Sequence, residues 1–174
     1  MSRRNGAAER RKNLCKEYWP DQIVWTGSKT EDGEEELGWC PMPRTFPLIL
    51  ALLSSKEISK NKDPSKVYLE LWSRHLGEGL IEMGHEADHA YAAGYYGSRA
   101  VRTWQERMQI LEDVGFICTV KVGNQKYRYV GLVHPTVAVQ KLRDASKIDD
   151  PWWHAYLARK AETKEATYQE VVSR

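Results

Sequence analysis

One five-residue stretch has the spacing of a metal site. His85-Glu86-Ala87-Asp88-His89 matches the HExxH pattern, in which two histidines on one helix face bind zinc. Glu86 would then act as general base toward a metal-bound water. However, no third ligand follows at a recognised spacing, and the predicted helix already ends at Gly94. A zinc metallopeptidase is therefore only our third hypothesis. We expect no cofactor, and we interpret His85–His89 as polar residues on the exposed side of a supporting helix whose Ala87 and Ala90 pack inward.

Other catalytic patterns are weaker still. The sequence contains neither a GxxxxGK[ST] nor a GxGxxG phosphate-binding loop. Cys118 falls in a predicted strand and His134 ends the next one, so a Cys–His pair is conceivable. A buried structural cysteine is the simpler interpretation. We expect that the protein is not an enzyme.

A second group of side chains suits nucleic acid. A helix is predicted from Ser98, as N-cap, to about Val114, with Gly115 closing it. Its apolar stripe consists of Val101, Trp104, Met108 and Leu111. Its opposite side carries Arg99, Arg102, Thr103 and Glu106. Arginine bonds bidentately to guanine, threonine can contact a thymine methyl or a phosphate, and a helix N-terminus attracts anions. These residues are candidates for contacts in the major groove.

After Gly115 the spacing of the hydrophobic residues changes from the helical repeat to every second residue, which is the repeat of a β-strand. Two such stretches around a short turn predict a β-hairpin. Strands are expected over residues 116–122 and 126–133, around Gly123-Asn124-Gln125. The hairpin carries a run of basic and amide side chains with no acid among them: Lys121, Asn124, Gln125, Lys126 and Arg128. Such a tip favours the DNA backbone or minor groove. The alternative for both elements is a solvated helix face and a polar hairpin that bind nothing.

Further elements must hold this helix and hairpin in place. A helix that starts at Thr45 or Phe46, with Pro47 in its first turn, is apolar nearly all round and is expected at the centre of the core. Other predicted elements are a helix from Asp63-Pro64, a strand over 80–83, helices over 85–93 and 136–145, and a last helix with Asp150 as N-cap. That last helix becomes polar beyond Lys160 and is expected to extend into solvent.

Composition and charge limit the class of protein. The chain has 174 residues, of which 41% are hydrophobic, enough for one folded domain. No apolar run is long enough to span a bilayer, and the charged N-terminus predicts no secretory signal. Three widely spaced cysteines fit a reducing cytoplasm. The charges are unevenly distributed along the chain. The net charge is only +2, but residues 1–16 hold six basic side chains and one acidic one, as nucleic-acid-binding arms often do. The acidic run 31–36 is expected to be a solvated loop.

The predicted order across residues 64–145 is helix, strand, helix, turn, helix, hairpin, helix. With Ala90 and Gly94, then Ser98-Arg99-Ala100-Val101-Arg102-Thr103-Trp104 and Leu111-Glu112-Asp113-Val114-Gly115-Phe116-Ile117, it resembles the winged helix-turn-helix family of DNA-binding domains. Plasmid- and phage-borne replication initiators and regulators are the members it most resembles. The likeness covers about half of the chain.

The resemblance implies a mainly helical α+β fold. The winged-helix domain, with its preceding helix, would span residues 38–146, after a basic and acidic arm (1–37) and before a C-terminal helix (147–174). It also implies sequence-specific binding of double-stranded DNA by a bacterial plasmid or mobile-element protein, in replication, partition or transcription control. The alternative is a winged-helix protein-interaction subunit of a larger nucleoprotein complex. In that case Trp152 and Trp153 would contact a protein partner or a second copy, unless they fold back on the domain.

Overall fold

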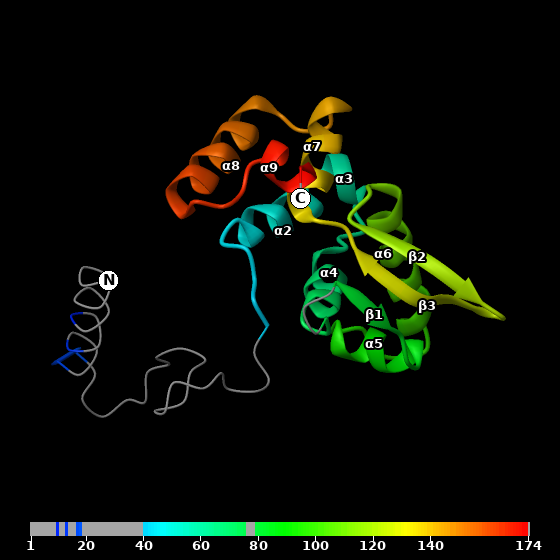
Figure 1. Cartoon of the computed structure of the whole chain (residues 1–174). Coiled ribbons are helices and arrows are strands. Elements are labelled where there is room, and N and C mark those ends of the chain that lie inside the picture. Colours follow the sequence, from blue (N-terminus) through cyan, green and yellow to red (C-terminus); the bar gives the residue numbers. More distant parts are fainter. Residues whose placement is uncertain (1–9, 11–12, 14–16, 19–39, 76–78, 174) are drawn as a thin grey trace. The chain divides into compact units, whose positions relative to one another are not determined.

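The computed structural model describes residues 10, 13, 17–18, 40–75 and 79–173 (Figure 1). The chain divides into two compact units, Met1–Trp39 and Cys40–Arg174. Most of the predicted arm 1–37 lies outside the described residues. All the elements discussed below belong to the second unit.

The second unit is a mainly helical α+β structure with a small antiparallel sheet, as the sequence predicts at this coarse level. The helices are α2 (Phe46–Ser54), α3 (Lys56–Ser59), α4 (Ser65–Trp72), α5 (Glu86–Ala92), α6 (Ala100–Asp113), α7 (Pro135–Asp144), α8 (Asp150–Thr163) and α9 (Tyr168–Val172). The strands are β1 (Leu80–Glu82), β2 (Ile117–Val122) and β3 (Gln125–Leu132). β3 lies between the other two, with Val130 opposite both Ile81 and Thr119. Within the described ranges, no helix combines the length and apolar character needed to cross a membrane.

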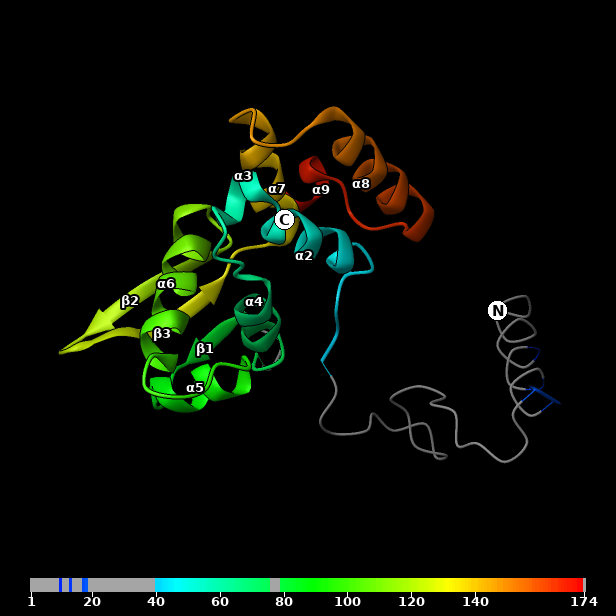
Figure 2. The same cartoon turned by 180° about the vertical axis from the view of Figure 1, so that it is seen from behind.

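The hairpin and the C-terminal helices occupy different parts of this unit. Figures 1 and 2 show β2 and β3 extending together away from the helices. In both views α5 lies at one end and α8 lies at the other, with α2 between them. The hairpin is therefore open to solvent near its tip, where Val120 and Val122 are more than half exposed.

The core forms around α2, as its apolar sequence predicts. Pro47 lies in the first turn of α2, and Phe46, Ile49, Leu52 and Leu53 are buried. The Phe46 ring stacks on Tyr68 of α4 at 5.4 Å between centroids, and Tyr68 meets Phe116 edge-on at 5.3 Å. These aromatic contacts join α2, α4 and the start of the hairpin in one cluster.

Two glycines end the helices α5 and α6 where the sequence predicts. Gly94 and Gly115 have φ of +84° and +77°, a conformation that costs other residues energy. After α6 the N–H of Gly115 donates to the Glu112 carbonyl at 3.0 Å, and that of Phe116 donates to the Leu111 carbonyl at 2.9 Å. This is a Schellman motif, and it turns the chain directly from α6 into β2.

Several predicted boundaries are wrong. Ser98 is not the N-cap of α6: Arg99 holds that position and its side chain makes no capping bond. The N-cap of α8 is Asp149, whose carboxylate accepts a 2.7 Å bond from the Trp152 N–H, while Asp150 pairs with Arg143. The hairpin turn is shorter than predicted, because Gln125 already belongs to β3.

The predicted C-terminal helix 147–174 is in fact two helices. α8 ends at Thr163 and the chain turns back into α9, which is capped by a reciprocal pair of bonds between Thr167 and Glu170. Lys160, expected at the start of a solvated end, is only 6% exposed. Beyond Lys160 the chain returns to contact α7 through α9, although no residue of α9 is buried.

A carboxylate from the link between α8 and α9 caps the first helix of the unit. Glu165 Oε1 accepts from the backbone N–H of Thr45 at 2.9 Å, and Oε2 accepts from the Thr45 hydroxyl at 2.7 Å. Thr45 is the N-cap residue of α2 and is buried. A negative charge at a helix N-terminus is stabilising, and here it also joins two ends of the unit.

We expect Glu165→Ala to lower the free energy of unfolding by about 1–2 kcal/mol, because a part-buried N–H and hydroxyl lose their acceptor. Urea unfolding measures this loss. The matched control is Glu162→Ala, which removes an exposed pair with Arg159 and should cost less than about 0.5 kcal/mol. Equal costs for the two variants would contradict the capping role.

Candidate nucleic-acid interface

Helix α6 is fixed by the buried side of its amphipathic pattern. Trp104, Met108 and Leu111 are fully buried, as predicted, and Val101 is half-buried. On the outer side Ser98, Arg99 and Arg102 are exposed. Thr103 and Glu106 are half-buried on the same helix. The predicted division of α6 into a core side and a polar side is therefore confirmed.

A stack of three rings joins α6 to its neighbours. The imidazole of His89, from α5, stacks on Trp104 at 5.9 Å and 25°. Tyr127, from β3, meets the same indole edge-on at 5.5 Å and 87°. Because Trp104 contacts a ring from α5 and another from β3, α6 cannot rotate about its axis without breaking both contacts.

His89 is in turn held by two hydrogen bonds inside the protein. Its Nε2 accepts the backbone N–H of Gly84 at 3.2 Å, and its Nδ1 lies 3.1 Å from Glu70 Oε1. Since Nε2 accepts, the ring proton is on Nδ1 and is donated to the carboxylate. Glu70 is 7% exposed and also pairs with Arg74. This buried group links α4, the turn after β1, and α5.

The HExxH stretch does not form a shared metal-binding face. His85 is exposed and precedes α5 with extended backbone, whereas His89 is 3% exposed and faces the core. Glu86 accepts a 2.6 Å bond from Gln105 of α6. No cluster of three or more potential metal ligands occurs in the part of the chain that the structure describes. The interpretation of this segment as an exposed polar face is wrong for His89, and the inward packing predicted for Ala87 is wrong because Ala87 is exposed.

Glu106 lies within a group of cations on the outer side of α6. Its carboxylate oxygens lie 3.1 Å from Lys62 Nζ, 3.2 Å from Arg107 and 3.6 Å from Arg102. The hydrogen bond from Lys62, with the charges of Lys62 and both arginines, holds the pKa of Glu106 below its usual value. Glu106 therefore stays ionised and is positioned to orient Arg102.

Two of the predicted hairpin residues make hydrogen bonds within the protein. The side-chain amide of Gln125 donates to the carbonyls of Met83 and Gly84, at 3.2 and 3.0 Å. Arg128 donates to the same Met83 carbonyl at 3.0 Å and pairs with Glu82. These bonds attach β3 to the segment after β1, so both side chains fix the position of the hairpin.

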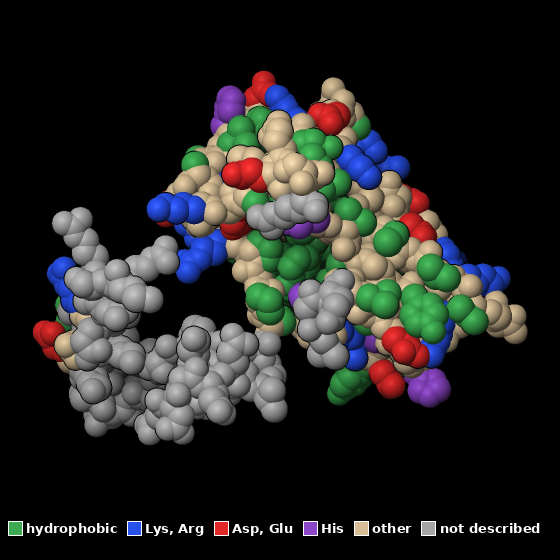
Figure 3. Space-filling model, viewed as in Figure 1, with side chains coloured by type: hydrophobic (Ala, Val, Ile, Leu, Met, Phe, Trp, Pro, Cys, Tyr) green, Lys and Arg blue, Asp and Glu red, His purple; other side chains and the backbone are tan. Residues whose placement is uncertain are grey.

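The other hairpin side chains face solvent. Lys126 is exposed, lies 4.8 Å from the centre of the Tyr127 ring and contacts Gln109 of α6. Lys121 and Asn124 are exposed, and neither side chain has a hydrogen-bond or ion-pair partner among the described residues. Figure 3 shows Lys and Arg side chains on the hairpin side of the molecule. Lys121 and Asn124 are thus the hairpin groups most available to a ligand.

Two exposed tyrosines next to α6 were not predicted as site residues. Tyr91, in α5, and Tyr96, in the turn before α6, are 68% and 69% exposed, and their rings meet edge-on at 5.1 Å. Their neighbour Tyr95 is half-buried, with Arg107 at 5.8 Å from its ring. Periodicity cannot separate Tyr95 from Tyr96, because the turn between the helices interrupts the repeat.

The C-terminal tryptophans belong to the fold. Trp152 and Trp153 are half-buried, pack against the core cluster, and flank Tyr156 at 5.1 and 5.9 Å. Arg143 covers the Trp153 ring at 5.6 Å. The interpretation in which they fold back on the domain is therefore confirmed.

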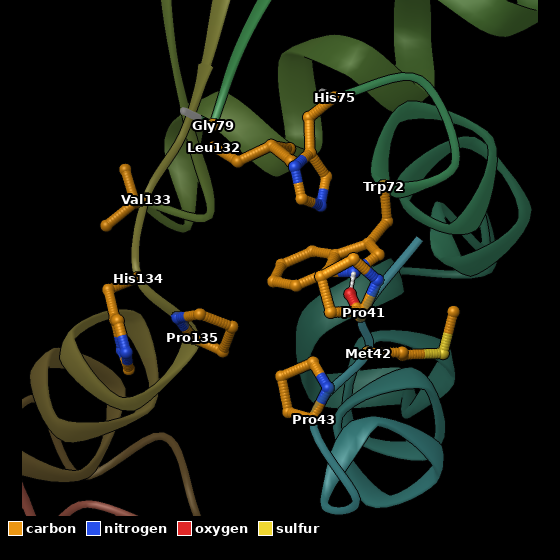
Figure 4. A pocket seen from close by; sticks show the side chains of 10 residues that line it. All are labelled: Pro41, Met42, Pro43, Trp72, His75, Gly79, Leu132, Val133, His134 and Pro135. Carbon is orange, nitrogen blue, oxygen red and sulfur yellow. Dashed lines mark hydrogen bonds between the residues drawn. The ribbon is translucent and has the colours of Figure 1, made fainter. Parts of the chain in front are cut away.

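A mainly apolar cavity of about 460 Å³ opens elsewhere on this unit (Figure 4). Its wall comes from the segment 41–43, from the end of α4 and from the chain between β3 and α7. Trp72 crosses it and donates from Nε1 to the Pro41 carbonyl at 3.0 Å. No Lys, Arg, Asp or Glu lines it within the described ranges, so it lacks the cations that a DNA contact needs.

Comparison with protein-family models, with curated proteins and with solved structures finds no significant match to this chain. The function of the site is therefore inferred from the geometry of its own residues.

We expect His89→Phe to lower the free energy of unfolding by about 2–3 kcal/mol. Phenylalanine keeps a ring against Trp104 but leaves the Gly84 N–H without an acceptor and removes one of the two donors to Glu70, the other being Arg74. The control is His85→Phe, at an exposed position four residues away, which should change stability by less than about 0.5 kcal/mol. Both are measured by urea unfolding, and a reversed order would contradict the buried role of His89.

Proposed function

We propose that this protein binds double-stranded DNA, using residues 64–145 as a winged helix. The supporting observation is the order α4-β1-α5-α6-β2-β3 together with a sheet in which β3 lies between β1 and β2. In this proposal α6 is the recognition helix and the β2–β3 hairpin is the wing.

The proposal depends mainly on the N-terminal half of α6. Arg99 and Arg102 are exposed there, on a helix whose rotation is fixed by Trp104 beneath them. Arginines in this position can bond to guanine edges in the major groove. No side chain from the described residues caps the first turn of α6, so its backbone N–H groups, with the exposed Ser98, suit a phosphate.

The remaining residues take supporting roles in the proposed complex. Thr103 contacts DNA beside the arginines, and Glu106 positions Arg102. Lys121, Asn124 and Lys126 contact phosphates from the wing, and the hydroxyls of Tyr91 and Tyr96 extend this backbone contact from the turn before α6. Gln125 and Arg128 act indirectly, because their internal bonds hold the wing at a fixed angle.

The biological setting is proposed by resemblance alone. A bacterial plasmid or mobile-element protein for replication, partition or transcription control is the setting that the sequence pattern suggests. The same fold also serves as a protein-interaction module, but its predicted contact residues, Trp152 and Trp153, pack against the core. DNA binding is therefore the function that the exposed side chains support best.

We expect Arg102→Ala to weaken binding to a duplex selected from a random pool by about 1–3 kcal/mol, and to relax the sequence preference. Fluorescence anisotropy on the selected and on scrambled duplexes measures both effects. The control is Arg159→Ala, on the exposed side of α8, which should leave binding unchanged. If both variants bind like the original protein, α6 is not the reading helix.

We expect Lys121→Ala to weaken binding by the same factor on every duplex, because a phosphate contact carries no sequence information. The slope of log affinity against log salt should fall by about one unit. The matched control is Lys141→Ala, an exposed lysine on α7. A loss confined to one sequence would instead place Lys121 on a base edge.

A further inference from the structure

Lys160 of α8 is a buried amine, and no described residue places a counter-ion directly beside it. It is 6% exposed, and its Nζ donates to the Thr136 hydroxyl at 2.7 Å and lies 5.5 Å from the centre of the Tyr156 ring. No described carboxylate approaches within 4.0 Å of this Nζ, although several surface lysines and arginines have such a partner. One hydroxyl satisfies one of the three protons of an ammonium group.

The carboxylate of the neighbouring Glu165 already accepts hydrogen bonds from another residue. Both oxygens of Glu165 accept from Thr45, so this carboxylate caps α2 rather than pairing with Lys160. Burial lowers the pKa of the Lys160 amine, against the weaker opposite effect of the charges of Glu165 and Glu170. A lysine that is buried without an ion pair is costly, and an anion that enters beside it removes that cost.

Lys160 and Thr136 line a cavity of about 340 Å³ among α7, α8 and α9. The volume falls within the range of about 300–1,000 Å³ that is typical of small-molecule sites. Trp153, Tyr156 and Tyr168 supply aromatic walls, and Gln140 supplies an amide. The cavity therefore combines flat apolar surface with the Lys160 amine and nearby hydrogen-bonding groups. Glu165, whose carboxylate is bonded to Thr45, also lines it.

We propose that this cavity binds a small carboxylic acid with a planar apolar ring. Its carboxylate pairs with the Lys160 ammonium and accepts from the Thr136 hydroxyl, while its ring lies against the aromatic walls. A carboxylate fits better than a phosphate, because Lys160 is the single cation among the described lining residues, and the charges of Glu165 and Glu170 oppose a dianion more strongly than a monoanion. The site uses none of the proposed DNA contacts, so the proposal does not depend on DNA binding.

The test is calorimetric titration of the full chain with benzoate, and with benzamide as an uncharged ligand of the same shape. We expect benzoate to bind and benzamide to bind at least tenfold more weakly. Lys160→Met keeps an unbranched side chain but removes the charge, and should weaken benzoate binding at least tenfold. The control Lys147→Met removes an exposed lysine and should change nothing.

A second variant keeps the test decisive if Lys160→Met unfolds. Ala161→Phe fills the cavity from an exposed position without altering the lysine, and should also abolish benzoate binding. Thermal unfolding shows whether each variant is folded. The proposal is overturned if millimolar benzoate does not bind the original protein, if benzamide binds equally well, or if a folded Lys160→Met or Ala161→Phe variant keeps full affinity.

Discussion

The buried carboxylate of Glu70 is the constraint on which the arrangement of α4, α5 and α6 depends. A carboxyl group in a protein interior needs hydrogen-bond partners, and here Arg74 and His89 both donate to one oxygen of Glu70. The second bond fixes the imidazole, and the imidazole then supports Trp104. The hydrogen bonding of the Glu70 carboxylate in α4 thus fixes His89 and, through it, Trp104. The position of Trp104 in turn determines which side of α6 is available to a ligand.

Internal contacts also hold the hairpin in place. Tyr127 closes the ring stack from β3, while Gln125 and Arg128 attach that strand to the chain after β1. Helix and hairpin are therefore held by one set of contacts. Loss of a buried partner would alter the angle between them without touching any exposed arginine, and would in this way change the DNA contacts that we propose.

Sequence periodicity identifies the types and order of the elements because each period corresponds to a regular burial pattern. It therefore predicts α2, the core stripe of α6 and the hairpin. It does not reveal the internal bonds of Gln125, Arg128 and His89, because most of their partners are distant in sequence: Gly84 is 41 positions from Gln125, Met83 is 45 from Arg128 and Glu70 is 19 from His89. It also places the N-cap of α8 one residue late, since Asp149 and Asp150 are chemically equivalent until the backbone is known.

The bond from Glu165 to Thr45 has a consequence for synthesis on the ribosome. The two residues are 120 positions apart, so α2 emerges long before its capping carboxylate exists. During that interval the first turn of this apolar helix lacks its Glu165 acceptor, and the core around the helix is incomplete. Translation must pass Glu165 before the earliest helix of this unit becomes fully stable, and a stalled or prematurely terminated chain would present α2 to chaperones and proteases.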